Sequence, residues 1–160
     1  MSSDEAFLEG LLRALKSSKL EAVIVGSVAA VLQGAPLMTQ DVDLLIRDTP
    51  RNREKLADLC SALGEVRLVQ PSPHSRTLST VGTEVQIDLL FDELPSTHAS
   101  FESLRSRSVQ VPIGDQLAVV AALEDVIASK AAADRDKDRA QLPILRNTLR
   151  IKRKLEEEGQ

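Results

Sequence analysis

Aromatic residues are scarce in this sequence. Of its 160 residues three are Phe, and none is Trp or Tyr. Proteins that bind single-stranded nucleic acids usually stack the bases on aromatic side chains, so the composition disfavours a protein that reads RNA in this way. The formal net charge of −4 also argues against a general nucleic-acid coat protein, because such proteins are basic as whole domains.

Cysteine and long apolar runs are scarce as well. The single cysteine, Cys60, excludes an internal disulfide framework. The first ten residues, MSSDEAFLEG, are acidic and lack the basic start and apolar run of an export signal. No stretch approaches the roughly 20 apolar residues of a membrane helix. We therefore expect a cytoplasmic protein with no membrane partner.

Length and hydrophobic content predict one domain over residues 1–160. With 42% hydrophobic residues the chain is long enough for one core and short for two. Within this domain we expect a core at about residues 20–90 and a helical C-terminal part at about residues 115–157.

Hydrophobic periodicity and turn residues predict an α/β (α+β) fold, with a small mixed β-sheet, helices packed on one face, and an active site open on the other. The expected helices are residues 3–16, 27–32 and 50–63, one that Asp115 caps, and one from Pro143 to about Glu157. The expected strands are residues 22–25, 42–46, 65–69, 75–81, 84–90 and 107–111. Because Pro143 would break a helix interior, a separate short helical segment is expected before it.

Two carboxylates stand out in an otherwise apolar strand. Asp41 and Asp43 are two residues apart, so both side chains lie on the same face of the sheet. Each raises the pKa of the other unless a cation intervenes, which indicates a divalent-metal site or a strand end open to water. In a later strand Asp88 offers a third oxygen ligand. Such ligands suit Mg²⁺ or Mn²⁺.

A glycine turn precedes this pair. Gly26 ends an apolar strand and allows close approach of the backbone, and Ser27 then stands where a helix N-cap belongs. The N–H groups of such a helix start can bind nucleotide phosphates, although an isolated Gly-Ser start is usually only a cap. Followed by Asp41, Asp43 and Asp88 in this order, the turn has the arrangement that one phosphate-and-metal site requires.

These residues resemble the signature of a known superfamily. Val25-Gly26-Ser27, then 13 residues, then Asp41-Val42-Asp43-Leu44 is similar to the polymerase-beta-like nucleotidyltransferases, and Asp88 resembles their third carboxylate. This similarity covers residues 20–90. Residues 123–130 and 135–138 are similar to the C-terminal helices of the minimal AbiEii-like bacterial branch, which includes toxins of toxin–antitoxin pairs.

The resemblance implies a nucleotidyltransferase fold with added C-terminal helices and a metal-dependent reaction. A nucleoside monophosphate moves from a nucleoside triphosphate to an acceptor hydroxyl, and pyrophosphate is released. Asp41 and Asp43 would hold both metal ions, while Asp88 would hold the catalytic ion and help to deprotonate the acceptor. The implied partners are a nucleoside triphosphate, an acceptor that is RNA such as transfer RNA, a protein or a small molecule, and a cognate antitoxin if the protein is a toxin.

Lys130 is a further candidate for nucleotide binding. It belongs to an apolar helical stripe with Leu123 and Val126, so its ammonium either reaches water along an apolar stem or contacts a phosphate. Asp138 shares a predicted face with Leu142, where it would orient Lys130 or cap the helix. Basic residues after position 145 indicate either a solvated face or a site for a polyanionic acceptor.

Two other functions compete with this interpretation. A non-catalytic member of the fold would bind nucleotides or another protein, but the presence of all three carboxylates favours an enzyme. A metal-dependent phosphoesterase could use the same acidic cluster, but the spacing between the Gly-Ser turn and the Asp-x-Asp pair disfavours it.

Overall fold

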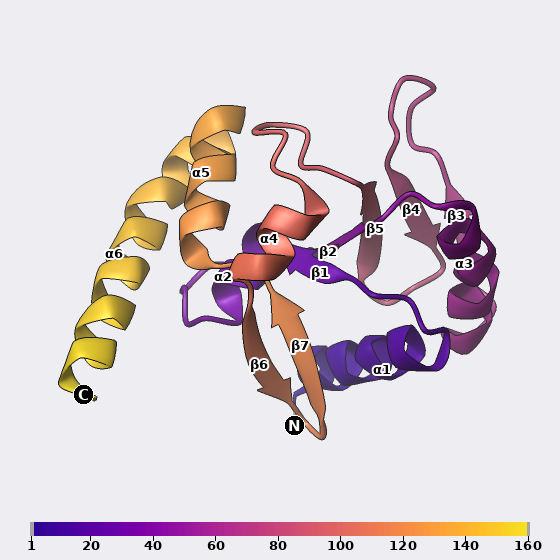
Figure 1. Ribbon diagram of the computed structural model, residues 1–160, viewed down its shortest axis with the longest axis horizontal. Helices are drawn as coiled ribbons and strands as arrows, with labels where there is room; N and C mark the ends of the chain where they lie inside the picture. The colour runs from indigo at the N-terminus through magenta and orange to yellow at the C-terminus, as the bar shows by residue number, and fades with distance from the viewer. Residues whose placement is uncertain (1, 160) are drawn as a thin grey trace.

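A mixed sheet of seven strands organises the protein (Figure 1), whose computed structural model describes residues 2–159. The strand order is β3-β4-β5-β2-β1-β7-β6. The strands are β1 (Val23–Val25), β2 (Asp41–Ile46), β3 (Arg67–Val69), β4 (Leu78–Val81), β5 (Gln86–Phe91), β6 (Val109–Ile113) and β7 (Gln116–Val120). The helices are α1 (Ser3–Ser17), α2 (Gly26–Val31), α3 (Pro50–Ala62), α4 (Phe101–Arg107), α5 (Leu123–Ala133) and α6 (Asp136–Glu158). The predicted α/β fold class is confirmed.

The middle of the sheet brings the candidate residues to one level. β2 pairs antiparallel with β1 and parallel with β5. In this register Asp43 lies beside Val25 on one neighbouring strand and beside Asp88 on the other. Residues that are register partners share a face of the sheet, so the end of β1 and both carboxylates meet at one place.

The opposite face of the sheet is packed into the core. Leu44 and Leu89 are fully buried there, and burial of each such side chain stabilises the fold by about 1.5–3 kcal/mol. Phe91 follows Asp88 by three residues and therefore points away from it. The guanidinium of Arg53 on α3 lies 3.9 Å from the centre of the Phe91 ring. α3 thus covers the face opposite the carboxylates.

The starts of α1 and α3 agree with their predicted positions. The Ser2 hydroxyl accepts a hydrogen bond from the Glu5 N–H (3.2 Å) and caps α1. Thr49 does the same for α3, with the Asn52 N–H at 3.0 Å and Pro50 in the first turn. Both helices begin within a residue of the predicted position because their caps are encoded beside them in the sequence.

The predicted helix that begins at Asp115 is wrong. The residues after Asp115 form β7, which pairs with β6 in a hairpin, and α5 begins only at Leu123. β-branched Val119 and Val120 suit a strand, and hairpin pairing with β6 decides between the two structures. The Asp115 carboxylate binds the Arg13 guanidinium on α1 at 2.9 Å instead of capping a helix.

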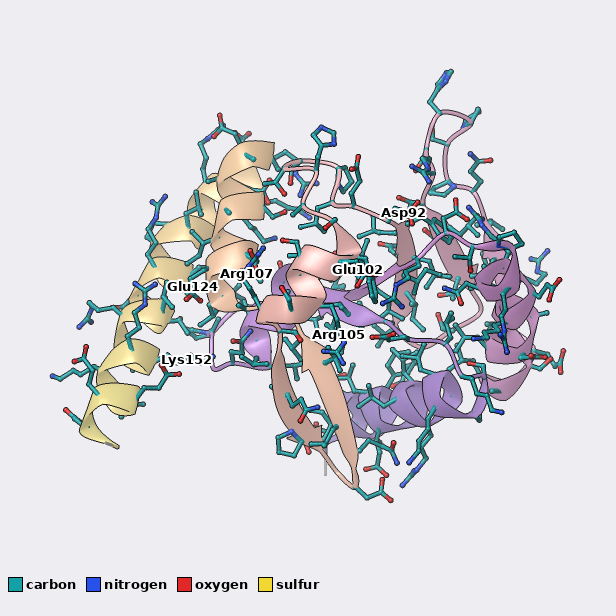
Figure 2. The ribbon with its side chains drawn as sticks, in the orientation of Figure 1. Asp92, Glu102, Arg105, Arg107, Glu124 and Lys152 are labelled. Carbon is teal, nitrogen blue, oxygen red and sulfur yellow. The ribbon has the colours of Figure 1, made fainter. Side chains whose placement is uncertain are left out.

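The predicted break at Pro143 is also wrong, because α6 continues through this residue. A proline inside a helix costs about 3 kcal/mol, and burial of Leu142 and Leu145 beside it offsets this cost. Farther along α6, Lys152 Nζ donates to Gln33 Oε1 at 2.7 Å and ties the helix to the end of α2 (Figure 2). Neither α6 nor any other helix within residues 2–159 is long and apolar enough to cross a membrane.

α4 is a helix that the sequence analysis did not predict. Ser100 caps it, with its hydroxyl accepting from the Ser103 N–H at 3.1 Å. Two of its side chains, labelled in Figure 2, form ion pairs with residues outside the helix: Glu102 with Arg47, at 2.6 Å, and Arg105 with Glu21, at 2.9 Å. The signal was the Ser100 cap, but a helix of seven residues has too little periodicity to be recognised.

Candidate active site

The carboxylates of Asp43 and Asp88 form the centre of the site. They are register partners on parallel strands, and Asp88 Oδ1 also accepts hydrogen bonds from Ser79 Oγ (2.7 Å) and Gln86 Nε2 (2.8 Å). Burial, and then the negative charges of Asp88 and Asp41, raise the pKa of Asp43 to about 6. A pair whose ionisation is opposed in this way gains stability from a bound cation.

Asp41 stands at the exposed start of β2, on the same face as Asp43. Together with Asp43 and Asp88 it lines a cavity of about 500 Å³. Within residues 2–159 no three His, Cys, Asp or Glu side chains are arranged to hold a metal ion by themselves. Mg²⁺ commonly binds one or two carboxylates together with substrate phosphates, so the Asp43–Asp88 pair fits the protein half of such a site.

Gly26 is packed against this carboxylate pair. Its φ of +72° lies in the left-handed region that favours glycine. A Cβ at this position would lie 2.5 Å from Asp43 Oδ2, which is closer than atoms can approach. The glycine therefore permits both the turn from β1 into α2 and the position of the carboxylate.

Ser27 does not have its predicted role as an N-cap. α2 already begins at Gly26, Val25 takes the cap position, and no side chain caps the helix. The Ser27 hydroxyl instead accepts from Lys130 Nζ at 2.8 Å and donates to Gln141 Oε1 at 3.2 Å. Because Gly26 turns the chain one residue earlier than expected, Ser27 faces α5 and α6 and links both helices to α2.

Lys130 is buried, so its ammonium does not extend into bulk water. Only 7% of the residue is exposed, and Nζ lies 3.6 Å from Asp138 Oδ1 in addition to its bond with Ser27. Burial lowers the pKa of Lys130, and the charge of Asp138 opposes that effect. The ammonium is held beside Ser27 in the wall of the cavity that contains both carboxylates.

Asp138 has both of the alternative roles considered for it. It is fully buried and faces Lys130, and it also caps α6 by accepting from the Arg135 N–H (3.2 Å) and from Arg135 Nε (2.7 Å). Burial raises the pKa of Asp138, but the hydrogen bonds from Arg135 and the positive charges of Arg135 and Lys130 together lower it overall. Asp138 is therefore an anion that positions two cations at the site.

The structure adds residues that the sequence analysis did not select. Arg135, Lys137 and Gln141 line the cavity with the predicted residues. Lys137 and Gln141 are four residues apart on one face of α6, and this spacing lies within the short helical segment expected before Pro143. The sequence analysis did not select them because only the packing of α6 on α5 brings this face to the carboxylates. The basic side chains of the later part of α6 line a different groove, of about 560 Å³, and none of them lines the carboxylate cavity.

The sheet, the Gly-Ser turn and the carboxylate strands together define the nucleotidyltransferase class. The family described as "Nucleotidyltransferase of unknown function (DUF6036)" matches residues 6–151. The chain belongs to this family. No curated protein matches the sequence.

Solved structures of the same fold are distant in sequence. ANT(2")-Ia in complex with adenylyl-2"-tobramycin is 14% identical with a TM-score of 0.66, over 92% of this chain and 90% of that one. The lincosamide antibiotic adenylyltransferase LnuA, lincomycin-bound, is 12% identical with a TM-score of 0.64, over 92% and 98%. TM1012 of Thermotoga maritima, assigned as a nucleotidyltransferase, is 20% identical with a TM-score of 0.62, over 92% and 96%. These similarities establish the fold.

Proposed function

We propose that the protein transfers a nucleoside monophosphate from a nucleoside triphosphate to an acceptor hydroxyl, with Mg²⁺ or Mn²⁺, and releases pyrophosphate. One observation carries this proposal: the Asp43–Asp88 pair and the Lys130–Ser27 hydrogen bond line the same cavity. A site with two adjacent carboxylates and a buried ammonium suits a substrate that brings both phosphates and metal.

The proposed roles follow from the contacts of each side chain. Asp43 and Asp88 would hold the metal, and Asp41 would join them from the start of β2. When bound, the metal neutralises phosphate charge and lowers the pKa of the attacking hydroxyl. Lys130 and Ser27 would donate hydrogen bonds to the phosphate oxygens, where charge-assisted bonds are strong. Asp88 would accept the acceptor proton.

Asp43→Asn tests this assignment. We expect it to abolish transfer of label from α-labelled triphosphate to acceptors in a cell extract, because the variant loses one metal ligand. Asp58→Asn is the matched control, since Asp58 is an exposed residue of α3 that does not line the carboxylate cavity. Equal labelling by wild type and Asp43→Asn would favour a non-catalytic nucleotide-binding or protein-interaction role instead.

The biological setting is proposed from the sequence resemblance of residues 123–138. An AbiEii-like member would be the toxin of a toxin–antitoxin pair, and its cognate antitoxin would be a partner. Expression of the wild type and of Asp43→Asn in a bacterial host tests the proposal. Growth arrest by the wild type alone is expected, and equal growth of both strains would contradict a toxin that acts by nucleotidyl transfer.

A further inference from the structure

Two cavities meet at the carboxylate pair. One has a volume of about 500 Å³ and the other about 450 Å³. Four side chains line both cavities, namely those of Asp43, Asp88, Lys130 and Arg135. The other lining residues differ, so the proposed reaction centre lies between two chambers of different chemistry.

The larger cavity, which we call the polar chamber, suits the triphosphate. Its remaining lining includes Ser27, Lys137 and Gln141, which supply hydrogen-bond donors and a further positive charge. With Lys130 and Arg135 the chamber has three cationic side chains. Phosphate oxygens require this kind of surface.

The second cavity, which we call the aliphatic chamber, is different. Leu90 from β5, Leu94 and Pro95 from the following loop, and Val126 and Ala133 from α5 form much of its wall. Its additional polar groups are mainly hydroxyls. Among the described residues no aromatic side chain lines either chamber, so base stacking does not distinguish the two, and the difference between them is aliphatic against polar lining.

A hydrogen bond between two hydroxyl groups joins two elements in the wall of the aliphatic chamber. Ser96 Oγ, after β5, and Ser129 Oγ, on α5, are 3.0 Å apart and share a hydrogen bond, and Thr77 lies in the same lining. Of the described residues that line this chamber and not the other, Asp138 is the ionisable one, and it is buried and already paired with Arg135 and Lys130. A polycationic ligand would therefore find no free carboxylate beyond the proposed metal ligands.

We infer that the aliphatic chamber binds the acceptor, and that the acceptor is an uncharged small molecule with a hydroxyl group on a largely apolar body. Pockets for small molecules have volumes of about 300–1,000 Å³. Here the aliphatic side chains of β5, the following loop and α5 face the charged groups that line both chambers, so an acceptor can place an apolar body on the first and its hydroxyl beside the second. The basic groove of α6, which a polyanion such as RNA would use, does not line this chamber, and an aminosugar would need free carboxylates. The inference rests on the proposed function and names its second substrate.

The chemical step is balanced within these two chambers. The acceptor oxygen forms a bond to the α-phosphorus, and the bond from that phosphorus to the bridging oxygen breaks. Pyrophosphate leaves with the electron pair into the polar chamber. The acceptor proton passes to Asp88, which lines both chambers.

Ala133→Leu fills the aliphatic chamber and tests the inference. Leucine is a good helix former, and Ala133 is only half-buried, so the helix should tolerate it. Ala132→Leu is the matched control, because Ala132 is exposed on the same helix and lines neither chamber. The probes are menthol and n-octyl glucoside as neutral alcohols, kanamycin as a polycation, and total RNA as a polyanion.

Two readouts are needed: ligand-observed NMR binding in the presence of a non-hydrolysable triphosphate, and transfer of label from α-labelled triphosphate. We expect the neutral alcohols to bind and to be labelled. Ala133→Leu should weaken their binding about 10-fold or more, with the affinity for triphosphate unchanged, because added volume in a packed site is unfavourable. Ala132→Leu should behave as the wild type.

The outcomes separate this inference from the proposed function. Labelling of RNA or kanamycin at a rate that Ala133→Leu does not change would keep the transfer reaction and overturn the acceptor class. Equal loss of triphosphate affinity in Ala133→Leu would show that the chamber holds the nucleoside, and would also overturn it. Binding of the alcohols that depends on Ala133, without transfer of label to any probe, would keep the chamber assignment and refute the proposed function. Absence of such binding would refute the inference.

Discussion

Gly26 and Asp43 come so close that a side chain on the glycine would collide with the carboxylate. A Cβ on Gly26 would lie 2.5 Å from Asp43 Oδ2. The Gly26-Ser27 turn and the Asp43 strand are therefore one packed unit. The turn at the end of β1 determines how near the backbone and Ser27 come to the carboxylates. The Gly-Ser turn owes its position to this contact more than to helix capping, since no side chain caps α2.

Gly26→Ala should therefore damage both the fold and the site. A left-handed φ costs a residue with a Cβ about 1–2 kcal/mol, and the clash with Asp43 adds to this cost. Gly34→Ala is the control, since Gly34 has a φ of +101° but no atom within 4 Å of the added Cβ. Denaturant unfolding and triphosphate titration should show a loss of stability in both variants and a loss of affinity only in Gly26→Ala. Equal affinities in the two variants would contradict the packed unit.

The sequence predicted the parts of the fold that local signals determine. Apolar periodicity located α1, Pro50 located the start of α3, and alternation placed Asp41 and Asp43 on one face of the sheet. β7 was missed because its pairing with β6 is a tertiary preference, which overrode a helical pattern from Asp115. Local propensity could not reveal this competition.

The site was predicted in the same uneven way. The carboxylates, Gly26 and Lys130 could be selected from the sequence because each breaks a local pattern in an apolar strand or helix; the structure brings them together around the Asp43–Asp88 pair, and their roles stay predictions. Arg135 and Gln141 were missed because their place at the site depends on how α6 packs on α5. This packing is a tertiary contact, and the sequence alone does not display it.

Asp43 should make stability depend on pH in the absence of metal. The folded protein raises the pKa of this carboxyl from 3.8 to about 6, so between these values the folded state binds more protons than the unfolded state. Its contribution to stability is therefore lost as pH rises through this window. Asp43→Asn lacks this effect, and its free energy of unfolding minus that of the wild type should increase from about pH 4 to pH 6 and then level off. Denaturant titrations at several pH values with EDTA provide the measurement, and a constant difference would show that the carboxyl is not perturbed.

Ser27 and Lys130 should act as a coupled pair. Their hydrogen bond of 2.8 Å joins α2 to α5. Loss of either partner should therefore lower the free energy of unfolding almost as much as loss of both. Ser27→Ala, Lys130→Met and the double variant form the cycle, in which Met keeps the apolar stem of the lysine. We expect Lys130→Met to weaken triphosphate binding about 10- to 100-fold, which corresponds to a charged hydrogen bond of about 1.5–3 kcal/mol. Strictly additive effects on the free energy of unfolding would mean that the bond does not form in solution.

Metal and nucleotide should stabilise the protein cooperatively. Without a cation the charges of Asp43 and Asp88 oppose each other, and ligands that bind only the folded state raise the melting temperature by mass action. Mg²⁺ releases its waters reluctantly and commonly binds with substrate phosphates, so Mg²⁺ alone should have a small effect. Metal and triphosphate together should raise the melting temperature by more than the sum of their separate effects.

Asp88→Ala should remove most of this excess, and Asp58→Ala, on the exposed face of α3, should leave it intact. Thermal melts of the three proteins in four conditions (no ligand, metal, triphosphate, and both) measure it. Loss of Asp88 also removes the acceptor of the Ser79 and Gln86 hydrogen bonds, so the comparison uses the excess within each protein and not the absolute melting temperature. If the wild type shows no excess with any common triphosphate, the carboxylates do not form a metal–nucleotide site. In that case the raised pKa of Asp43 would reflect only its burial and the nearby charges of Asp88 and Asp41, and protonation instead of a bound cation would relieve the repulsion within the pair.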